Sequence, residues 1–86
     1  PEIIAVYPNP FEATINVDVL LPQAAELGIE VVNLMGQKMG FLQKFNLSAG
    51  QHTLSLDLSK LAAGTYIGKM TVNGIIANTV KFVKAQ

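Results

Sequence analysis

The chain has 86 residues; half are apolar, only 14% are charged, and the formal net charge is zero. This length supports one domain, which needs most of its apolar side chains for a single core. The absence of cysteine excludes disulfides, zinc–thiolate sites and cysteine nucleophiles, and the absence of arginine at zero net charge argues against nucleic acid as a partner.

The charges are nevertheless sorted along the chain. Five of the six acidic residues lie within residues 2–30, whereas all six lysines lie within residues 38–84, with only Asp57 among them. Lysines on strand edges prevent pairing with foreign strands, and a basic docking face near the C-terminus is the alternative interpretation. No apolar run approaches the roughly 18 residues of a membrane helix, so we expect no membrane insertion.

The first predicted strand covers residues 3–7 and runs into the segment Tyr7-Pro8-Asn9-Pro10-Phe11. The two prolines fix φ and remove two backbone donors, which forbids both a helix and a central strand. We therefore expect a rigid extended or turn element at residues 7–11, with Phe11 as its hydrophobic anchor.

Beyond this segment, apolar and polar residues alternate with a period of two, interrupted about every ten residues by Gly, Asn or Pro. The alternation gives each strand one apolar and one polar face. It predicts further strands over residues 13–20, 27–34, 38–45, 51–58, 65–72 and 75–83.

Residues 57–64 depart from this alternation and carry Leu58 and Leu61 three positions apart, which suggests one helical turn. Tyr66 then opens the sixth strand, and its place resembles the tyrosine corner of immunoglobulin-like sandwiches, where the hydroxyl bonds back to the loop backbone. The pair Asn73-Gly74 tolerates positive φ, so it predicts a type I′ hairpin between the last two strands.

Seven strands with one apolar face each require a second layer, because a single sheet would leave that face in water. We therefore expect an all-β fold, a seven-stranded antiparallel immunoglobulin-like β-sandwich with Greek-key connections. Residues 1–86 form one domain in this interpretation, with a core of about residues 3–84. Because the chain opens at Pro1-Glu2 without an initiator Met, we expect it to be part of a longer protein.

The residue types and their spacing give little indication of a catalytic or metal site. His52 is the only histidine, too few ligands for a zinc or iron site. No nucleophile-elbow pattern surrounds Ser48, Ser55 or Ser59, and no run of Asp or Asn supplies the oxygens of a calcium site. Paired carboxylates would lack a cleft in a sandwich this small. We expect no enzyme activity and no cofactor.

Sugar binding is an alternative, because sandwiches often stack sugars on exposed aromatic rings. Four of the six aromatic residues are Phe and none is Trp, a composition typical of a core rather than a platform. The aromatic residues are Tyr7, Phe11, Phe41, Phe45, Tyr66 and Phe82.

Three segments together resemble the type A C-terminal sorting domain of the type IX secretion system of Bacteroidetes. They are the opening Tyr7-Pro8-Asn9-Pro10-Phe11, the corner Leu61-Ala62-Ala63-Gly64-Thr65-Tyr66 and the closing Lys81-Phe82-Val83-Lys84. The resemblance runs from Tyr7 to Lys84 and includes a turn that ends at Gly36. It marks as recognition residues Tyr7, Pro8, Asn9, Pro10, Phe11, Gly36, Leu61, Gly64, Tyr66, Lys81, Phe82, Val83 and Lys84.

The central turn departs from the family pattern. This chain has Val32-Asn33 where the family often has Tyr-Asp, and Gln37 where a Lys or Arg commonly follows the glycine. Since Asn, like Asp, accepts backbone hydrogen bonds within a turn, we expect the turn itself to be kept.

The resemblance implies a non-catalytic sorting signal at the end of an exported protein. Such a domain folds in the periplasm and is recognised by the outer-membrane translocon, which moves the N-terminal passenger to the cell surface or the medium. A sortase-like peptidase then usually removes the domain, with a cut expected near or before Pro1. The alternative is a non-catalytic sandwich spacer or carbohydrate-binding module of a secreted hydrolase or adhesin.

For recognition we expect the last strand to be presented at a sheet edge. Val80 and Phe82 would point into the core, while Lys81 and Val83 would face outward. A partner strand could then gain affinity from main-chain hydrogen bonds and selectivity from alternate side chains.

Overall fold

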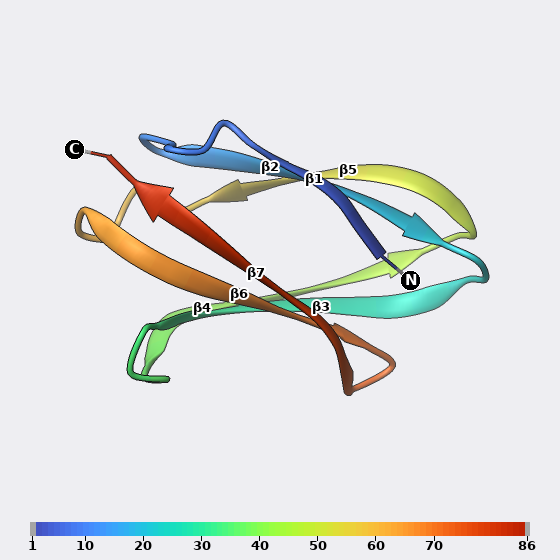
Figure 1. Cartoon of the computed structure of the whole chain (residues 1–86). Helices are drawn as coiled ribbons and strands as arrows, with labels where there is room; N and C mark the ends of the chain where they lie inside the picture. The colour runs from blue at the N-terminus through green and yellow to red at the C-terminus, as the bar shows by residue number, and fades with distance from the viewer. Residues whose placement is uncertain (1, 86) are drawn as a thin grey trace.

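The computed structural model describes residues 2–85 and contains seven strands (Figure 1). The seven predicted strands are confirmed, with ends shifted by at most two residues. They are β1 (Glu2–Tyr7), β2 (Thr14–Leu21), β3 (Ala25–Asn33), β4 (Lys38–Leu47), β5 (Gly50–Asp57), β6 (Gly64–Val72) and β7 (Ile75–Lys84).

The strands form two antiparallel sheets that face each other, as Figure 1 shows. The three-stranded sheet has the order β1-β2-β5, and the four-stranded sheet has the order β4-β3-β6-β7. Because β5 returns beside β2 and β6 beside β3, the connections follow a Greek-key pattern. The expected immunoglobulin-like β-sandwich is confirmed, with the fourth strand paired to β3 in the four-stranded sheet.

The core lies between the sheets and is built by the alternation in each strand. In β2, for example, Ile15, Val17, Val19 and Leu21 are buried, while the residues between them are not. Each such burial stabilises the fold by about 1.5–3 kcal/mol relative to an exposed side chain. The buried cluster comprises Phe11, Ile15, Val17, Val19, Leu21, Leu27, Ile29, Val31, Leu54, Leu56, Leu58, Tyr66, Met70 and Phe82.

The predicted type I′ hairpin is confirmed between β6 and β7. Asn73 has a φ of 51° and Gly74 a φ of 85°, the two positive values that this turn requires. The Asn73 N–H also donates to the Glu26 carbonyl at 2.8 Å, and the Asn73 Oδ1 accepts the Glu26 N–H at 2.9 Å. The hairpin is therefore tied to the start of β3.

The single turn expected within residues 57–64 is present at residues 58–61. The Leu61 N–H donates to the Leu58 carbonyl at 3.1 Å, and the chain then enters β6 at Gly64. The segment must cross from the three-stranded to the four-stranded sheet, with Leu58 buried and Leu61 packed against the core.

No helix within residues 2–85 is long and apolar enough to span a bilayer.

Candidate functional site

The recognition residues expected from sequence gather at one end of the sandwich, at the left of Figure 1. Tyr66 at the start of β6 pairs with Phe82 near the end of β7 and with Asn33 at the end of β3. Phe11 forms a bridge with Lys84. We call this the motif end. Because Asn33 opens the turn that contains Gly36, the central turn lies at the motif end too.

Three aromatic rings form the interior of the motif end. Phe11 packs edge-on against Phe82 with ring centroids 5.5 Å apart, and Tyr66 lies 6.4 Å from Phe82. All three residues are buried. The expectation that Phe11 anchors its segment is confirmed, and its anchor point is the last strand.

The segment at residues 8–11 is also hydrogen-bonded along the outer edge of β7. The Asn9 Oδ1 accepts the Val83 N–H at 2.9 Å. The Phe11 N–H donates to the Val83 carbonyl at 3.0 Å, and the Ala85 N–H donates to the Phe11 carbonyl at 2.7 Å. The Asn9 side-chain oxygen thus occupies the acceptor position that a backbone carbonyl of a neighbouring strand would otherwise fill.

The side chains of β7 alternate as expected. Phe82 is buried and Val80 packs against the core, whereas Lys81 and Val83 are exposed. The main chain adds a restriction, because both backbone groups of Val83 are already bonded to residues 9–11. Backbone groups alternate in direction along an antiparallel pair, so Lys81 and Thr79 are the next residues whose N–H and C=O point away from β6.

Tyr66 forms the expected tyrosine corner. Its hydroxyl donates to the Ala62 carbonyl at 2.5 Å, which ties the loop after β5 to the start of β6. Gly64 has a φ of 153°, which favours glycine over residues with a Cβ. Leu61 packs against the core beneath this loop. The corner therefore holds the loop in place beside the aromatic cluster.

The central turn is kept despite its departures from the family pattern. The Asn33 Oδ1 accepts the N–H groups of Met35 and Gln37, each at 2.9 Å, and the Asn33 Nδ2 donates to the Gln37 Oε1 at 2.7 Å. Gly36 adopts a φ of 82°. The expectation that Asn33 accepts the turn's backbone bonds is confirmed.

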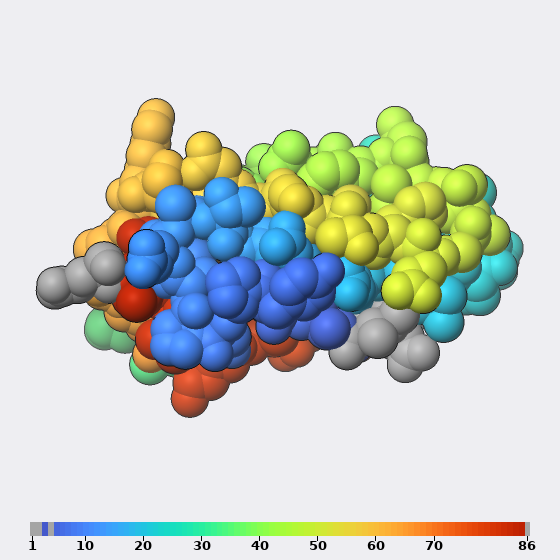
Figure 2. Space-filling view, turned by 90° about the horizontal axis from the view of Figure 1, so that it is seen from above, coloured from blue at the N-terminus to red at the C-terminus, as the bar shows by residue number. Residues whose placement is uncertain are grey.

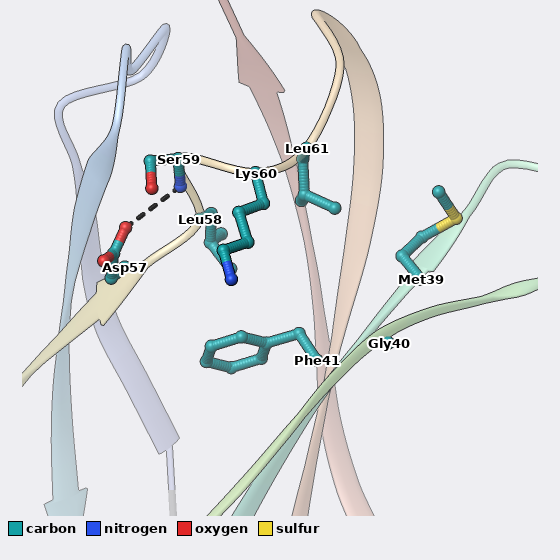
Figure 3. A pocket seen from close by; sticks show the side chains of 8 residues that line it. All are labelled: Met39, Gly40, Phe41, Asp57, Leu58, Ser59, Lys60 and Leu61. Atoms are coloured by element: carbon teal, nitrogen blue, oxygen red, sulfur yellow. Dashed lines mark hydrogen bonds between the residues drawn. The ribbon is translucent and has the colours of Figure 1, made fainter.

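A pocket of about 260 Å³ lies near the motif end, between the start of β4 and the loop after β5 (Figure 3). Figure 3 shows the Phe41 ring beneath the Lys60 side chain, with Met39 across the pocket. Hydrogen bonds from the Ser59 hydroxyl and N–H hold the pKa of Asp57 below its ordinary value. Asp57 is thus an ionised surface carboxylate and unsuited to act as a general acid at neutral pH.

His52 lies away from this pocket in β5, where its Nε2 is 2.8 Å from the Ser48 carbonyl. Among residues 2–85, no three His, Asp or Glu side chains come together to hold a metal ion.

The aromatic residues are not arranged as a sugar platform. Phe11, Tyr66 and Phe82 are buried, and Phe41 and Phe45 pack against the core. Tyr7 is exposed, and its hydroxyl donates to Asp18 at 3.1 Å. A single exposed ring on the described surface gives no row on which a sugar chain would stack.

The pairing of Asn9 with Val83 has no local signal in the sequence. The two residues are 74 positions apart, so neither periodicity nor turn chemistry brings them together. The pocket residues Met39 and Phe41 were likewise not foreseen, because the alternation assigns them only to a strand. The sequence offered two indirect signals of the contact between Asn9 and Val83: Asn9 lies between two prolines, and the last predicted strand was expected at a sheet edge.

The sequence matches the family described as "Secretion system C-terminal sorting domain" over residues 5–85. The structure is similar to the Pseudomonas fluorescens alkylpurine DNA glycosylase AlkC bound to DNA containing an abasic site analog, with a TM-score of 0.51 and 18% identity. That similarity covers 99% of this chain and 30% of the glycosylase chain, and at this identity it concerns the fold alone. A comparison with curated proteins gave no match.

Proposed function

Because the chain belongs to the secretion system C-terminal sorting domain family and directs the secretion of a passenger protein, we propose that the secretion machinery reads its folded motif end. The family is non-catalytic, so the chain is not an enzyme, and its destination is the cell surface or the medium. It is recognised by the type IX secretion machinery.

In this proposal the domain ends a longer exported protein. It folds in the periplasm, engages the outer-membrane translocon and carries the N-terminal passenger outward, after which a sortase-like peptidase removes it. These steps follow the family resemblance.

The observation that carries the proposal is the bonding of residues 9–11 to the end of β7. Two of the three family-like segments meet through hydrogen bonds to Val83 and through the contact of Phe11 with Phe82. The Tyr66 corner completes the cluster. A partner that binds this end contacts all three segments at once, although they are far apart in the chain.

The main-chain contacts of residues 9–11 also limit how a partner strand would pair with β7. Such a strand would bond to the outward groups of Lys81 and Thr79, because those of Val83 are occupied by Asn9 and Phe11. Lys81 would then lie beside the added strand and select among its side chains. We propose that Lys81 is the residue of β7 nearest the motif end that a partner strand can contact.

The experiment is an export assay with a reporter protein fused to this domain, in cells that have the secretion machinery. The intact domain should bring the reporter into the medium or onto the surface, and removal of residues 81–86 should trap it. The Asn9→Ala variant should also reduce export, because it frees the Val83 N–H. Asn46→Ala is the matched control, since Asn46 is exposed on β4 away from residues 9–11.

Circular dichroism of each purified variant separates loss of recognition from loss of folding. Undiminished export after removal of residues 81–86 would refute the proposal. Equal export by the Asn9→Ala and Asn46→Ala variants, with both folded, would show that the bonding of residues 9–11 is not read.

A further inference from the structure

The two outer faces of the sandwich differ in charge. On the three-stranded sheet, Asp18 points outward and accepts hydrogen bonds from Thr53 at 2.7 Å and Tyr7 at 3.1 Å. Ser55 donates to Asn16 at 2.7 Å on the same face. Figure 2 looks down on this sheet, with β1 and β2 in blue beside β5 in yellow. The described strand residues of this face include no lysine, and several of its polar side chains bond to one another.

The outer face of the four-stranded sheet carries most of the lysines. Leu27, Ile29 and Val31 of β3 are in the core, so the residues between them point outward. The strand register then places lysines from three strands on the same outer face. They are Lys38 and Lys44 of β4, Lys69 of β6 and Lys81 of β7, and we call this set the lysine face.

Two glutamates also lie on the lysine face. Glu30 lies 3.9 Å from Lys38, and Glu26 lies 3.9 Å from Lys44. Both contacts are long and the lysines in them are exposed, so each contributes little binding energy. Lys69 and Lys81 form no ion pair with the described acidic side chains. The face therefore has an excess of two positive charges.

Two large apolar side chains border the lysine face. Leu42 of β4, paired with Glu30, is 61% exposed, and Ile76 of β7, paired with Thr71, is 59% exposed. They lie on the two edge strands of the sheet, with the lysines between and beside them. Lysines interspersed with exposed aliphatic groups suit the boundary between lipid headgroups and acyl chains.

We propose that the lysine face docks reversibly on an anionic lipid bilayer. Lysine is a compact, hydrated point charge, which suits many phosphate groups without a fixed geometry. Arginine, which recognises single carboxylates or phosphates through paired hydrogen bonds of fixed geometry, is absent from the chain. The broad face of the sheet meets the bilayer, while the rest of the motif end stays accessible from the side.

The test is sedimentation of the 86-residue chain with lipid vesicles. The chain should bind vesicles of equal parts phosphatidylglycerol and phosphatidylcholine, and it should not bind vesicles of phosphatidylcholine alone. High salt should release it, because the Debye length falls to about 3 Å at 1 M ionic strength. Each face lysine should contribute about 1 kcal/mol near an anionic surface, which corresponds to about a fivefold change in partition coefficient.

The variants Lys69→Gln and Lys81→Gln should each lower the partition coefficient about fivefold. Lys60→Gln is the matched control, because it removes the same charge from the loop after β5, outside the lysine face. An equal effect of Lys60→Gln would show that net charge alone is sensed, and would overturn the proposal. So would binding to phosphatidylcholine alone, or binding to soluble polyglutamate without binding to the anionic vesicles.

Discussion

The two ends of the sandwich are closed by different kinds of contact. At the hairpin end, Asn73-Gly74 forms a turn from adjacent residues, and Asn73 then bonds to Glu26. At the motif end, Asn9 has no such local role, and its side chain bonds to Val83, 74 positions away. An asparagine oxygen caps a backbone N–H in both places.

This difference has a consequence for sorting. The Asn73-Gly74 turn is formed by residues that are adjacent in the chain. The motif end exists only when the segment after β1 lies against the end of the last strand. A machinery that reads the motif end therefore binds domains that are complete and folded.

The largest expected effect comes from Phe82→Ala, which removes the ring at the centre of the aromatic cluster of the motif end. Phe82 contacts both Phe11 and Tyr66, so its truncation should lower the free energy of unfolding by about 3–5 kcal/mol. Ile76→Ala, at the hairpin end of the same strand, removes an exposed side chain. It should change the free energy of unfolding by less than about 0.5 kcal/mol. Urea denaturation measures both, and similar losses would contradict the comparison.

Asn9→Ala should destabilise the motif end less than Phe82→Ala does. It leaves the Val83 N–H without its acceptor and should cost about 1 kcal/mol of unfolding free energy. Hydrogen exchange is the sharper measurement, since the Val83 amide should lose protection while the Asn73 amide, bonded to Glu26, keeps it. Unchanged exchange at Val83 would show that the Asn9 bond does not hold the strand end.

Tyr66→Phe tests the corner that supports the motif end. Loss of the hydrogen bond to Ala62 should lower the free energy of unfolding by about 0.5–1.5 kcal/mol, because the hydroxyl is partly buried. Tyr7→Phe is the matched control, since it removes an exposed hydroxyl that bonds Asp18 on the outer face. Thermal denaturation should rank Tyr66→Phe as the more destabilising change, and the reverse order would refute the structural role of the corner.

The smallest effect concerns pH at the loop before the corner. Hydrogen bonds from Ser59 lower the pKa of Asp57 in the folded chain, so the folded state favours the carboxylate. The resulting stability is present above the unfolded pKa and is lost as pH falls through the folded pKa. Asp57→Asn should flatten this acid dependence slightly in denaturation measured across acidic pH. An unchanged pH profile would show that the Ser59 bonds do not matter to stability.

The amino-acid sequence alone determined the elements that depend on neighbours in the chain. Alternation with a period of two identified all seven strands, and Asn73-Gly74 identified the hairpin, because strand periodicity and turn chemistry act over a few residues. Tyr66 was assigned to its corner by resemblance to the tyrosine corner of immunoglobulin-like sandwiches, and its hydroxyl bonds to the carbonyl of Ala62. The single turn after Asp57 was expected from the three-residue spacing of Leu58 and Leu61, and one hydrogen bond closes it.

Only the tertiary structure determined which distant segments contact one another. It brought Asn9 to Val83, paired β5 with β2 and β6 with β3, and placed lysines of three strands on one face. The sequence separates these residues by tens of positions, and the same alternating pattern is compatible with several strand orders. Their meeting depends on how two sheets bury one common core, which is a property of the whole chain rather than of any segment.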